Sequence, residues 1–377
     1  MSDAGVKKGS GQVGHSPSAT PKVVKGFPKP WRAAEVADGS QWIRQLTEAE
    51  QKGFLRGLEA FEASGKPLHS SVGSDFPFEN LDQLKADIED ALYRRLGFVL
   101  LRGMPLDGLS VPRIEALYWG WCNHLGVLRP QGKDSGLVKS VRDAGGTYRS
   151  ATGRGYNTNA ELDFHTDFAD YVTLLCINAA RSGGMSRISS TLAARQKMER
   201  EAPELVKELF EPIHYSRQGE ESPEQRPYYR APTFSEQDGW FSCRYSRNHT
   251  RHAHKFDGVP HPRHTQLAAM DLLDKTAGDP ELVLEMALRP GDMQLLNNHV
   301  TLHSRTAYVD YEEEDRKRHL LRAWIATPGS QPLSPLMEEA YLDSRAGSVR
   351  GGIIGKAYDA DKQAYTRNAA AFHGMLT

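Results

Sequence analysis

The segment ELDFHTDFADY, residues 161–171, places a histidine and an aspartate two positions apart among aromatic and apolar neighbours. It continues into the apolar run VTLLCIN, residues 172–178, so we predict a single β-strand through both. Residues i and i+2 of a strand project from the same face, which would direct His165 and Asp167 the same way. Imidazole and carboxylate groups both bind metal ions. The pair alone does not establish a site, because His-x-Asp is more often a surface pair or a hydrogen-bonded pair.

A second candidate ligand, His303, follows the apolar run MQLLNN and lies 136 residues after Asp167. Two histidines and one carboxylate, with the remaining positions open, are the ligand set of non-haem Fe(II) oxygenases. The third ligand would have to come from another strand of the same barrel, and His303 lies beside a predicted strand. A zinc hydrolase, or a barrel that binds metal without turnover, could use the same three residues.

Two arginines follow this histidine. Arg318 and Arg322 are four positions apart, and Arg322 alternates with apolar neighbours in the predicted strand HLLRAWIA. Such an arginine faces inward if its neighbours face outward, and a buried guanidinium needs an anionic partner. The partner could be an Asp or Glu side chain or a bound anion. A zinc hydrolase needs no second anion-binding arginine on a barrel strand, so the pair argues against that alternative.

Helices are predicted before these segments. A helical pattern covers residues 41–64, and a second one has Leu81, Leu84, Ile88 and Leu92 on one face. GFVLLRG, residues 97–103, indicates a buried strand, and residues 112–126 indicate a helix with proline in its first turn.

The pattern changes after Gly126, where short apolar runs separated by turn residues indicate a β-rich core. Helices are predicted at residues 192–210 and 262–277, outside this core. The segment RPGDM, residues 289–293, predicts a tight turn between two strands.

The composition limits the class of protein. Residues 1–26 are mostly Ser, Gly, Lys and Pro, so we predict a disordered tail there and a single domain over residues 27–377. Lys plus Arg (47) nearly equals Asp plus Glu (48), which favours a small-molecule partner over nucleic acid or a membrane surface. The composition is compatible with either a monomer or a homo-oligomer.

The cysteines and the apolar segments indicate the compartment. Cys122, Cys176 and Cys243 are far apart in the sequence, which suits reduced thiols better than disulfides or a thiolate zinc site. There is no stretch of signal-peptide type and no run of 18 apolar residues. We therefore predict a soluble cytoplasmic protein.

Three segments together resemble a known family. The motifs ELDFHTDFADYVTLLCINAARSGGMSRISS, RPGDMQLLNNHVTLHSRTAYVD and RKRHLLRAWIA look like those of the TauD/TfdA family of Fe(II)- and 2-oxoglutarate-dependent dioxygenases, clavaminate-synthase-like branch. The resemblance spans residues 97–327. It implies a mainly β fold with flanking α-helices, built on a double-stranded β-helix (jelly-roll) core.

The resemblance also implies roles for individual residues. Iron would be held by His165, Asp167 and His303. Arg318 would pair with the far carboxylate of 2-oxoglutarate, and Arg322 would lie nearer the metal-bound end or an anionic substrate group. The family often has Asp-Thr after its paired glycines, where this chain has Met185-Ser186, so Ser186 would keep the hydroxyl that contacts the cosubstrate.

The implied reaction is oxidation of a C–H bond of a small molecule, with 2-oxoglutarate and O2 converted to succinate and CO2. Halogenating relatives replace the ligand carboxylate by a small residue, and Asp167 is intact, which favours hydroxylation. Desaturation or cyclisation starts from the same hydrogen abstraction. The alternatives are a hydroxylase of protein or peptide side chains on the same barrel and a metal-binding barrel without catalysis.

Two further segments bear on the site. The Gly- and Asn-rich loop at residues 148–159 precedes the His165 strand and is interpreted as a lid over the substrate, with Arg154 and Asn159 as candidate contacts. The histidine-rich run at residues 249–264 is interpreted as a solvated loop at the rim and not as a second metal site.

Overall fold

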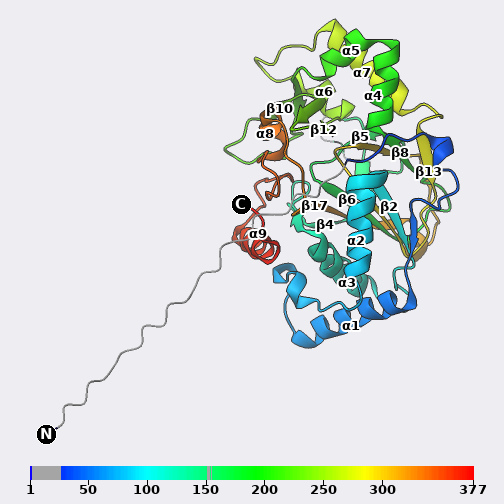
Figure 1. Cartoon of the computed structure of the whole chain (residues 1–377), viewed down its shortest axis with the longest axis vertical. Coiled ribbons are helices and arrows are strands. Elements are labelled where there is room, and N and C mark those ends of the chain that lie inside the picture. The colour runs from blue at the N-terminus through cyan, green and yellow to red at the C-terminus, as the bar shows by residue number, and fades with distance from the viewer. Residues whose placement is uncertain (2–26, 151–152, 154) are drawn as a thin grey trace.

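Two β-sheets with helices at both ends form the architecture (Figure 1). The computed structural model describes residues 1, 27–150, 153 and 155–377. The predicted disordered tail falls outside this range except for its first residue, so that expectation stays a prediction.

The larger sheet has seven strands in the order β1-β2-β14-β6-β17-β3, and β4 also pairs with β17. Only β1 and β2 pair in parallel; the other pairs of this sheet are antiparallel. The strands are β1 (Ile43–Gln45), β2 (Phe98–Arg102), β3 (Val127–Arg129), β4 (Val138–Val141), β6 (Tyr171–Asn178), β14 (Asp292–Asn297) and β17 (His319–Ala326).

The smaller sheet has four antiparallel strands in the order β13-β8-β15-β5. They are β13 (Val283–Met286), β8 (Ser186–Ser190), β15 (Thr301–Arg305) and β5 (Leu162–His165). Leu100 and Leu296 of the larger sheet share a buried apolar cluster with Ile188 and Met286 of the smaller one. The two sheets therefore pack together through their apolar side chains.

The helices cover the sheets from two ends (Figure 1). The first group, α1 (Glu48–Ser64), α2 (Asp82–Asp90), α3 (Val111–Leu125) and α9 (Ala360–His373), shares a core with the larger sheet. The second group, α4 (Thr191–Glu201), α5 (Pro203–Leu209) and α7 (His264–Ala277), contributes to a separate core at the opposite end. Two short helices remain, α6 (Arg247–Ala253) and α8 (Glu338–Tyr341).

Three two-stranded sheets, six short 3-10 helices and one π-helical turn (Ala91–Arg95) make up the remaining described elements. The sheets pair β9 (Ile213–Ser216) with β10 (Tyr228–Ala231), β11 (Phe234–Gln237) with β12 (Trp240–Cys243), and β7 (Ser182–Gly183) with β16 (Tyr308–Val309). None of the helices described is both long enough and apolar enough to cross a bilayer.

Most predicted elements are confirmed. The strand at 97–103 is β2, the helix at 112–126 is α3, and the short apolar runs become β6, β12, β13, β14 and β17. The region 192–210 holds two helices in place of one, because Pro203 cannot continue a helix and instead opens α5. In the predicted turn at 289–293, Gly291 has a φ of 82°, a value that glycine adopts without strain.

The helix predicted from residue 41 is wrong at its start, where residues 43–45 form β1. Thr47 is the N-cap of α1, and its side chain accepts a hydrogen bond from the Glu50 backbone N–H at 3.2 Å. The Glu50 carboxylate accepts in return from the Thr47 N–H at 2.7 Å. This capping box fixes the first turn of α1, and the preceding residues pair with β2 instead.

The single strand predicted through residues 161–178 is also wrong. β5 ends at His165 and β6 begins at Tyr171, and the two strands belong to different sheets. The link between them is held by Asn298, whose Oδ1 accepts from the Asp167 N–H at 2.9 Å and whose Nδ2 donates to the Ala169 carbonyl at 3.0 Å. Backbone groups that a continuous strand would have paired are thereby satisfied by one side chain.

Candidate active site

Three potential metal ligands converge where β5 leaves the smaller sheet. His165 ends β5 and lies directly opposite His303 of β15, and the two ring centroids are 4.4 Å apart. The carboxylate of Asp167 lies 3.9 Å from His165 Nε2 and 3.7 Å from His303 Nε2. One ligand atom from each of the three residues lies within 4.8 Å of the others. The structure brings the three predicted residues together, and Asp167 reaches the cluster from the link after β5.

The protonation states suit metal binding. The Nδ1 of His165 lies 2.8 Å from the Asp163 carbonyl oxygen, a contact in which Nδ1 donates its proton and leaves Nε2 as the ligand atom. Burial lowers the pKa of His303 to about 3, so its ring is neutral at pH 7. Neutral imidazole is the form that binds metals. Two imidazoles and one carboxylate of this kind fit Fe(II).

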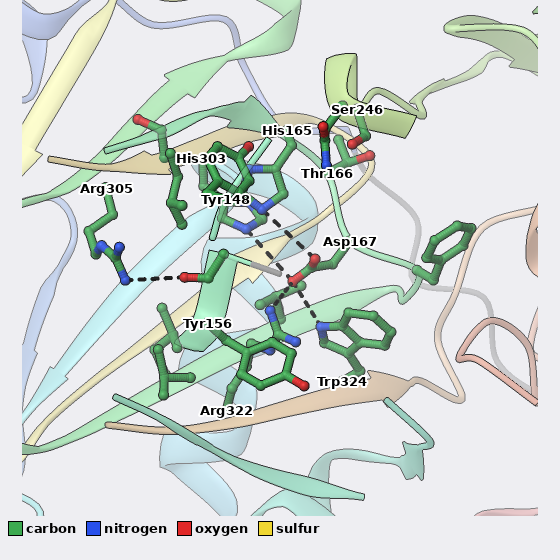
Figure 2. A pocket seen from close by; sticks show the side chains of 18 of the residues that line it. Tyr148, Tyr156, His165, Thr166, Asp167, Ser246, His303, Arg305, Arg322 and Trp324 are labelled. Atoms are coloured by element: carbon green, nitrogen blue, oxygen red, sulfur yellow. Dashed lines mark hydrogen bonds and ion pairs between the residues drawn. The ribbon is translucent and has the colours of Figure 1, made fainter. Parts of the chain in front are cut away.

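Asp167 is held from the side away from the histidines (Figure 2). The indole Nε1 of Trp324 donates to Asp167 Oδ2 at 2.8 Å, and Nη1 of Arg322 lies 3.5 Å from the same oxygen. Burial alone would raise the pKa of Asp167, but Arg322, the two histidines and the indole N–H lower it to about 2. The carboxylate is therefore ionised and fixed in orientation before any ion arrives.

The backbone between two of the ligands is braced by Arg244. Its Nη1 donates to the carbonyl of Thr166 at 2.8 Å, and its Nη2 donates to the hydroxyl of Tyr229 at 2.8 Å. The guanidinium also stacks 3.9 Å from the centre of the Phe168 ring. Because Thr166 lies between His165 and Asp167, this contact helps to fix both ligands.

Two more buried arginines lie beside this cluster. The guanidinium carbons of Arg318 and Arg305 lie 4.9 Å and 4.8 Å from the centre of the Tyr308 ring. Neither arginine forms an ion pair with a carboxylate of the described residues, and Arg318 Nη1 and Arg305 Nε are buried without hydrogen-bond partners. Burial lowers the pKa of Arg318 from its usual value and that of Arg305 to about 10. Arg305 donates to the backbone carbonyls of Thr158 and Ala160 at 2.7 Å and 2.6 Å, so its charge is not balanced by a carboxylate of the described residues but its guanidinium is held in place. Two buried guanidinium groups without a carboxylate partner are the surroundings that an anionic ligand requires.

The two predicted arginines therefore differ. Arg322 has an acidic partner, Asp167. The Nε of Arg322 also donates to Gln131 Oε1 at 2.8 Å. For Arg318 no such partner lies among the described residues. Leu321 and Ala323, the neighbours of Arg322, are buried in the core on the other face of β17, as the alternation indicated.

One cavity brings these groups together. Its lining includes the three metal-ligand candidates, Arg305, Arg318, Arg322 and Ser186. The hydroxyl of Ser186 donates to Gln294 Oε1 at 3.0 Å. Apolar and aromatic side chains form much of the remaining wall: Val141, Tyr148, Tyr156, Leu162, Phe168, Val172, Leu174, Leu288, Trp324 and Ile353.

The predicted lid contributes to the wall only in part. Tyr148 and Tyr156 line the cavity. Asn159 does not: it is exposed, and its carbonyl accepts a hydrogen bond from the Tyr308 N–H at 3.1 Å. Arg154 lies outside the described residues. The histidine-rich run is also only partly as expected, because residues 247–253 form α6 and His249 lines the cavity.

Several residues of the site were not predicted. Trp324 could have been found, since it lies two residues beyond Arg322 in a predicted strand. Arg305 lies two residues beyond His303, and β15, which was not predicted, places both on the same face. Arg244 and Asn298 carry no such signal, because they reach the site only through the pairing of distant segments.

Comparison with known proteins decides the family. Residues 64–324 match the model of the family described as taurine catabolism dioxygenase TauD, TfdA family. The chain belongs to this family. It is an Fe(II)- and 2-oxoglutarate-dependent dioxygenase, for which O2 is the second cosubstrate. The cavity of this TauD/TfdA dioxygenase is lined by three candidate metal ligands and by Arg318, which has no carboxylate partner among the described residues.

Individual relatives agree with this assignment. FR-33289 synthase of Streptomyces rubellomurinus is 35% identical over 299 residues, which cover 78% of this chain and 88% of that protein. A taurine hydroxylase-like protein of Stachybotrys chartarum is 26% identical over 324 residues, 79% of this chain and 81% of the relative.

Solved structures share the fold at lower identity. Asparagine oxygenase in complex with Fe(II), 2S,3S-3-hydroxyasparagine and succinate superposes with a TM-score of 0.59 at 16% identity, covering 76% of this chain and 94% of that one. The non-heme iron oxygenase OrfP in complex with Fe and alpha-ketoglutaric acid gives 0.55 at 18% identity, with 75% and 94% covered.

Proposed function

We propose that this dioxygenase hydroxylates a C–H bond of a small molecule, with His165, Asp167 and His303 as the iron ligands. The observation that carries the proposal is the convergence of these three side chains in one cavity with Arg318, a buried guanidinium that has no carboxylate partner among the described residues. Bound Fe(II) would supply O2 activation coupled to the decarboxylation of 2-oxoglutarate to succinate and CO2.

The side chains of the chain itself position the reactants. Arg318 would hold the far carboxylate of 2-oxoglutarate, with Arg305 adding a second positive charge across the Tyr308 ring. Ser186 would offer its hydroxyl to the same ligand. Arg322 and Trp324 keep the Asp167 carboxylate turned toward the metal. The apolar wall would limit water around the reacting atoms.

The two sheets supply the scaffold. We propose that the larger and the smaller sheet together form the double-stranded β-helix, with the cavity between them. Support comes from the apolar cluster shared by both sheets and from the lining of the cavity, to which β5, β8 and β15 contribute on one side and β6 and β17 on the other.

A small substrate is favoured over a peptide. The solved complexes of the two structural relatives contain hydroxylated amino acids, 3-hydroxyasparagine in one protein and (3S)-hydroxy-L-Arg in the other. We extend to this chain the general class, a small polar molecule, and not the particular amino acid. The three buried cysteines are unpaired, which supports the proposal of a reducing compartment such as the cytoplasm.

Replacement of a ligand tests the proposal. In His303→Ala, Fe(II) binding and the formation of succinate from 2-oxoglutarate should both be lost, because two ligands cannot replace the set of three. His264→Ala is the matched control, since His264 is exposed at the start of α7 and outside the cavity. Full 2-oxoglutarate decarboxylation by folded His303→Ala would show that the ligand assignment is wrong.

A further inference from the structure

The cavity has a second polar region, formed by the β9–β10 loop and the start of α6. Gln218 and Asn248 both line the cavity, and they are only 2% and 4% exposed. The amide oxygen and the amide nitrogen of Gln218 both lack hydrogen-bond partners, as does the amide oxygen of Asn248. Buried polar atoms are nearly always paired, so three unpaired ones in a cavity wall point to a ligand.

This region lies away from the arginines assigned to 2-oxoglutarate. Ser246, which precedes α6, forms a β-bridge with His165. In Figure 2 it lies on the other side of the metal-ligand cluster from Arg305. A molecule that reaches Gln218 and Asn248 would therefore approach the ligand cluster from the side opposite to 2-oxoglutarate.

The backbone at Gln218 is held in an unfavourable conformation. Its φ is 56°, a left-handed value that residues with a Cβ atom rarely adopt. The conformation is supported by the Gln218 N–H, which donates to Ser216 Oγ at 2.9 Å, and by the Arg217 N–H, which donates to the Pro227 carbonyl at 2.8 Å. Strain of this kind is retained where the surrounding structure fixes a functional side chain.

The unpaired atoms define the chemistry of the ligand. Two amide oxygens need donors, and the amide nitrogen of Gln218 needs an acceptor. An anion without N–H or O–H groups would leave both oxygens unpaired. The charges of the wall select neither a cation nor an anion, because the guanidinium of Arg244 and the buried carboxylate of Glu220 both line the cavity. A neutral amide supplies both kinds of group: a primary carboxamide can pair with all three atoms, and the single N–H and C=O of an N-acyl amine can pair with two of them.

We propose that Gln218 and Asn248 form a substrate subsite for an amide group, such as an N-acyl amine or a primary carboxamide. The proposal rests on the proposed function, because it places this subsite beside the metal and 2-oxoglutarate. Gln218 would pair with the N–H and the C=O of the amide, and Asn248 would accept a second N–H or orient the first. The dioxygenase would thus select amide-bearing small molecules over the corresponding esters, acids and amines.

Four matched probes test this selection: N-butylacetamide, butyl acetate, hexanoate and butylamine. Binding to the protein loaded with Fe(II) and 2-oxoglutarate is measured under argon by ligand-observed NMR, and succinate formation is then measured in air. The amide should bind about 10-fold more tightly than the ester, which lacks only the N–H, because an unpaired buried acceptor is left behind. Equal binding of amide and ester to the wild-type protein would overturn the proposal.

Variants assign the selection to the two side chains. Gln218→Leu and Asn248→Leu should each remove a large part of this preference of about 10-fold. Gln237→Leu, a change outside the cavity on β11, should leave it intact. Gln218→Glu keeps the size of the side chain and replaces Gln218→Leu if that variant does not fold. Because its carboxylate attracts an ammonium group, Gln218→Glu should bind butylamine better than the amide. An unchanged order of probes in folded Gln218→Glu and Asn248→Leu would also overturn the proposal.

A separate titration distinguishes failure of the subsite from failure of the proposed function. Calorimetric titration of 2-oxoglutarate into the Fe(II)-loaded wild-type protein requires no substrate. If 2-oxoglutarate does not bind, the proposed function is wrong. If it binds while the four probes show no preference for the amide, only the subsite is wrong.

Discussion

At the scale of single residues, Asp167 is the point on which the site converges. Its carboxylate lies next to two imidazoles, one guanidinium and one indole N–H, all from side chains that β5, β15 and β17 position. Hydrogen bonds to a ligating carboxylate fix its orientation, which reduces what must be ordered when the metal binds. Under the proposed assignment, Arg322 and Trp324 would act on the metal through Asp167.

Arg318 should determine the affinity for 2-oxoglutarate. A charge-assisted hydrogen bond contributes about 1.5–3 kcal/mol, so Arg318→Gln should raise the KM for 2-oxoglutarate by about 10- to 150-fold. Arg318→Lys should restore only part of the affinity, because an ammonium group cannot form the planar two-point contact. Arg316→Gln is the control, since Arg316 is exposed in the same segment. Steady-state kinetics over a range of 2-oxoglutarate concentrations measure the effect.

Replacement of Arg322 should affect turnover more than the affinity for 2-oxoglutarate, in contrast to replacement of Arg318. Because Arg322 contacts Asp167, Arg322→Gln should lower kcat more than it raises the KM for 2-oxoglutarate. A large loss of 2-oxoglutarate affinity in Arg322→Gln with none in Arg318→Gln would mean that the two roles are exchanged. No change in either variant would contradict the assignment of this region to the cosubstrate.

At the scale of elements, the sequence predicted strands and helices better than it predicted where they end. Alternation along β17 separated Arg322, which lines the cavity, from Leu321 and Ala323 on the other face, but these neighbours are buried against the helices and do not face outward. The same reasoning failed at residue 165, because apolar residues continue through the link that carries the chain from one sheet to the other. Nothing local marks that link, whose backbone is held by Asn298, a residue 131 positions away from Asp167.

His373, the last residue of α9, should make the free energy of unfolding depend on pH. Burial lowers the pKa of His373 to about 4, and its Nε2 lies 2.7 Å from the Asn123 carbonyl. Burial also lowers the pKa of the neighbouring His124, and Lys85 adds to the effect on both histidines. Between pH 6.5 and pH 4 the unfolded chain therefore binds a proton at His373 that the folded chain does not. Stability contributed by the neutral ring is lost as the pH falls through this window.

The size of this loss can be measured by urea unfolding. Between pH 7 and pH 5, His373 should lower the free energy of unfolding by about 1–2 kcal/mol. His373→Gln, whose amide can still donate to the Asn123 carbonyl, should remove that share of the pH dependence. An identical pH dependence in the variant and the wild type would rule out His373 as its source.

At the scale of the whole molecule, the ordered core should begin close to residue 27. Trp31 and Val36 are buried between strands of the two sheets, and the Trp31 indole donates to the Leu96 carbonyl at 2.9 Å. Deletion of residues 2–26 should leave turnover unchanged, because the composition of that segment gives it almost no residues to bury. Deletion of residues 2–36 should instead cost about 3–5 kcal/mol, as expected for the loss of a buried tryptophan.

Turnover and thermal unfolding of the two truncated proteins, compared with the full chain, check this boundary. Loss of activity on deletion of residues 2–26 would assign that segment a part in the site or in assembly. Equal stability of both truncated proteins would show that Trp31 and Val36 do not belong to the cooperative core.

The order in which the chain is synthesised bears on how the metal is acquired. His165 and His303 are direct neighbours across β5 and β15, yet they lie 138 positions apart in the sequence. Closing so long a loop is entropically costly, and sheets made from distant strands fold slowly. A nascent chain that has not yet extended through β15 offers Fe(II) only His165 and Asp167. Fe(II) should therefore bind only after the chain has folded. During refolding, Fe(II) uptake should occur at the same rate as the pairing of β15 with β5.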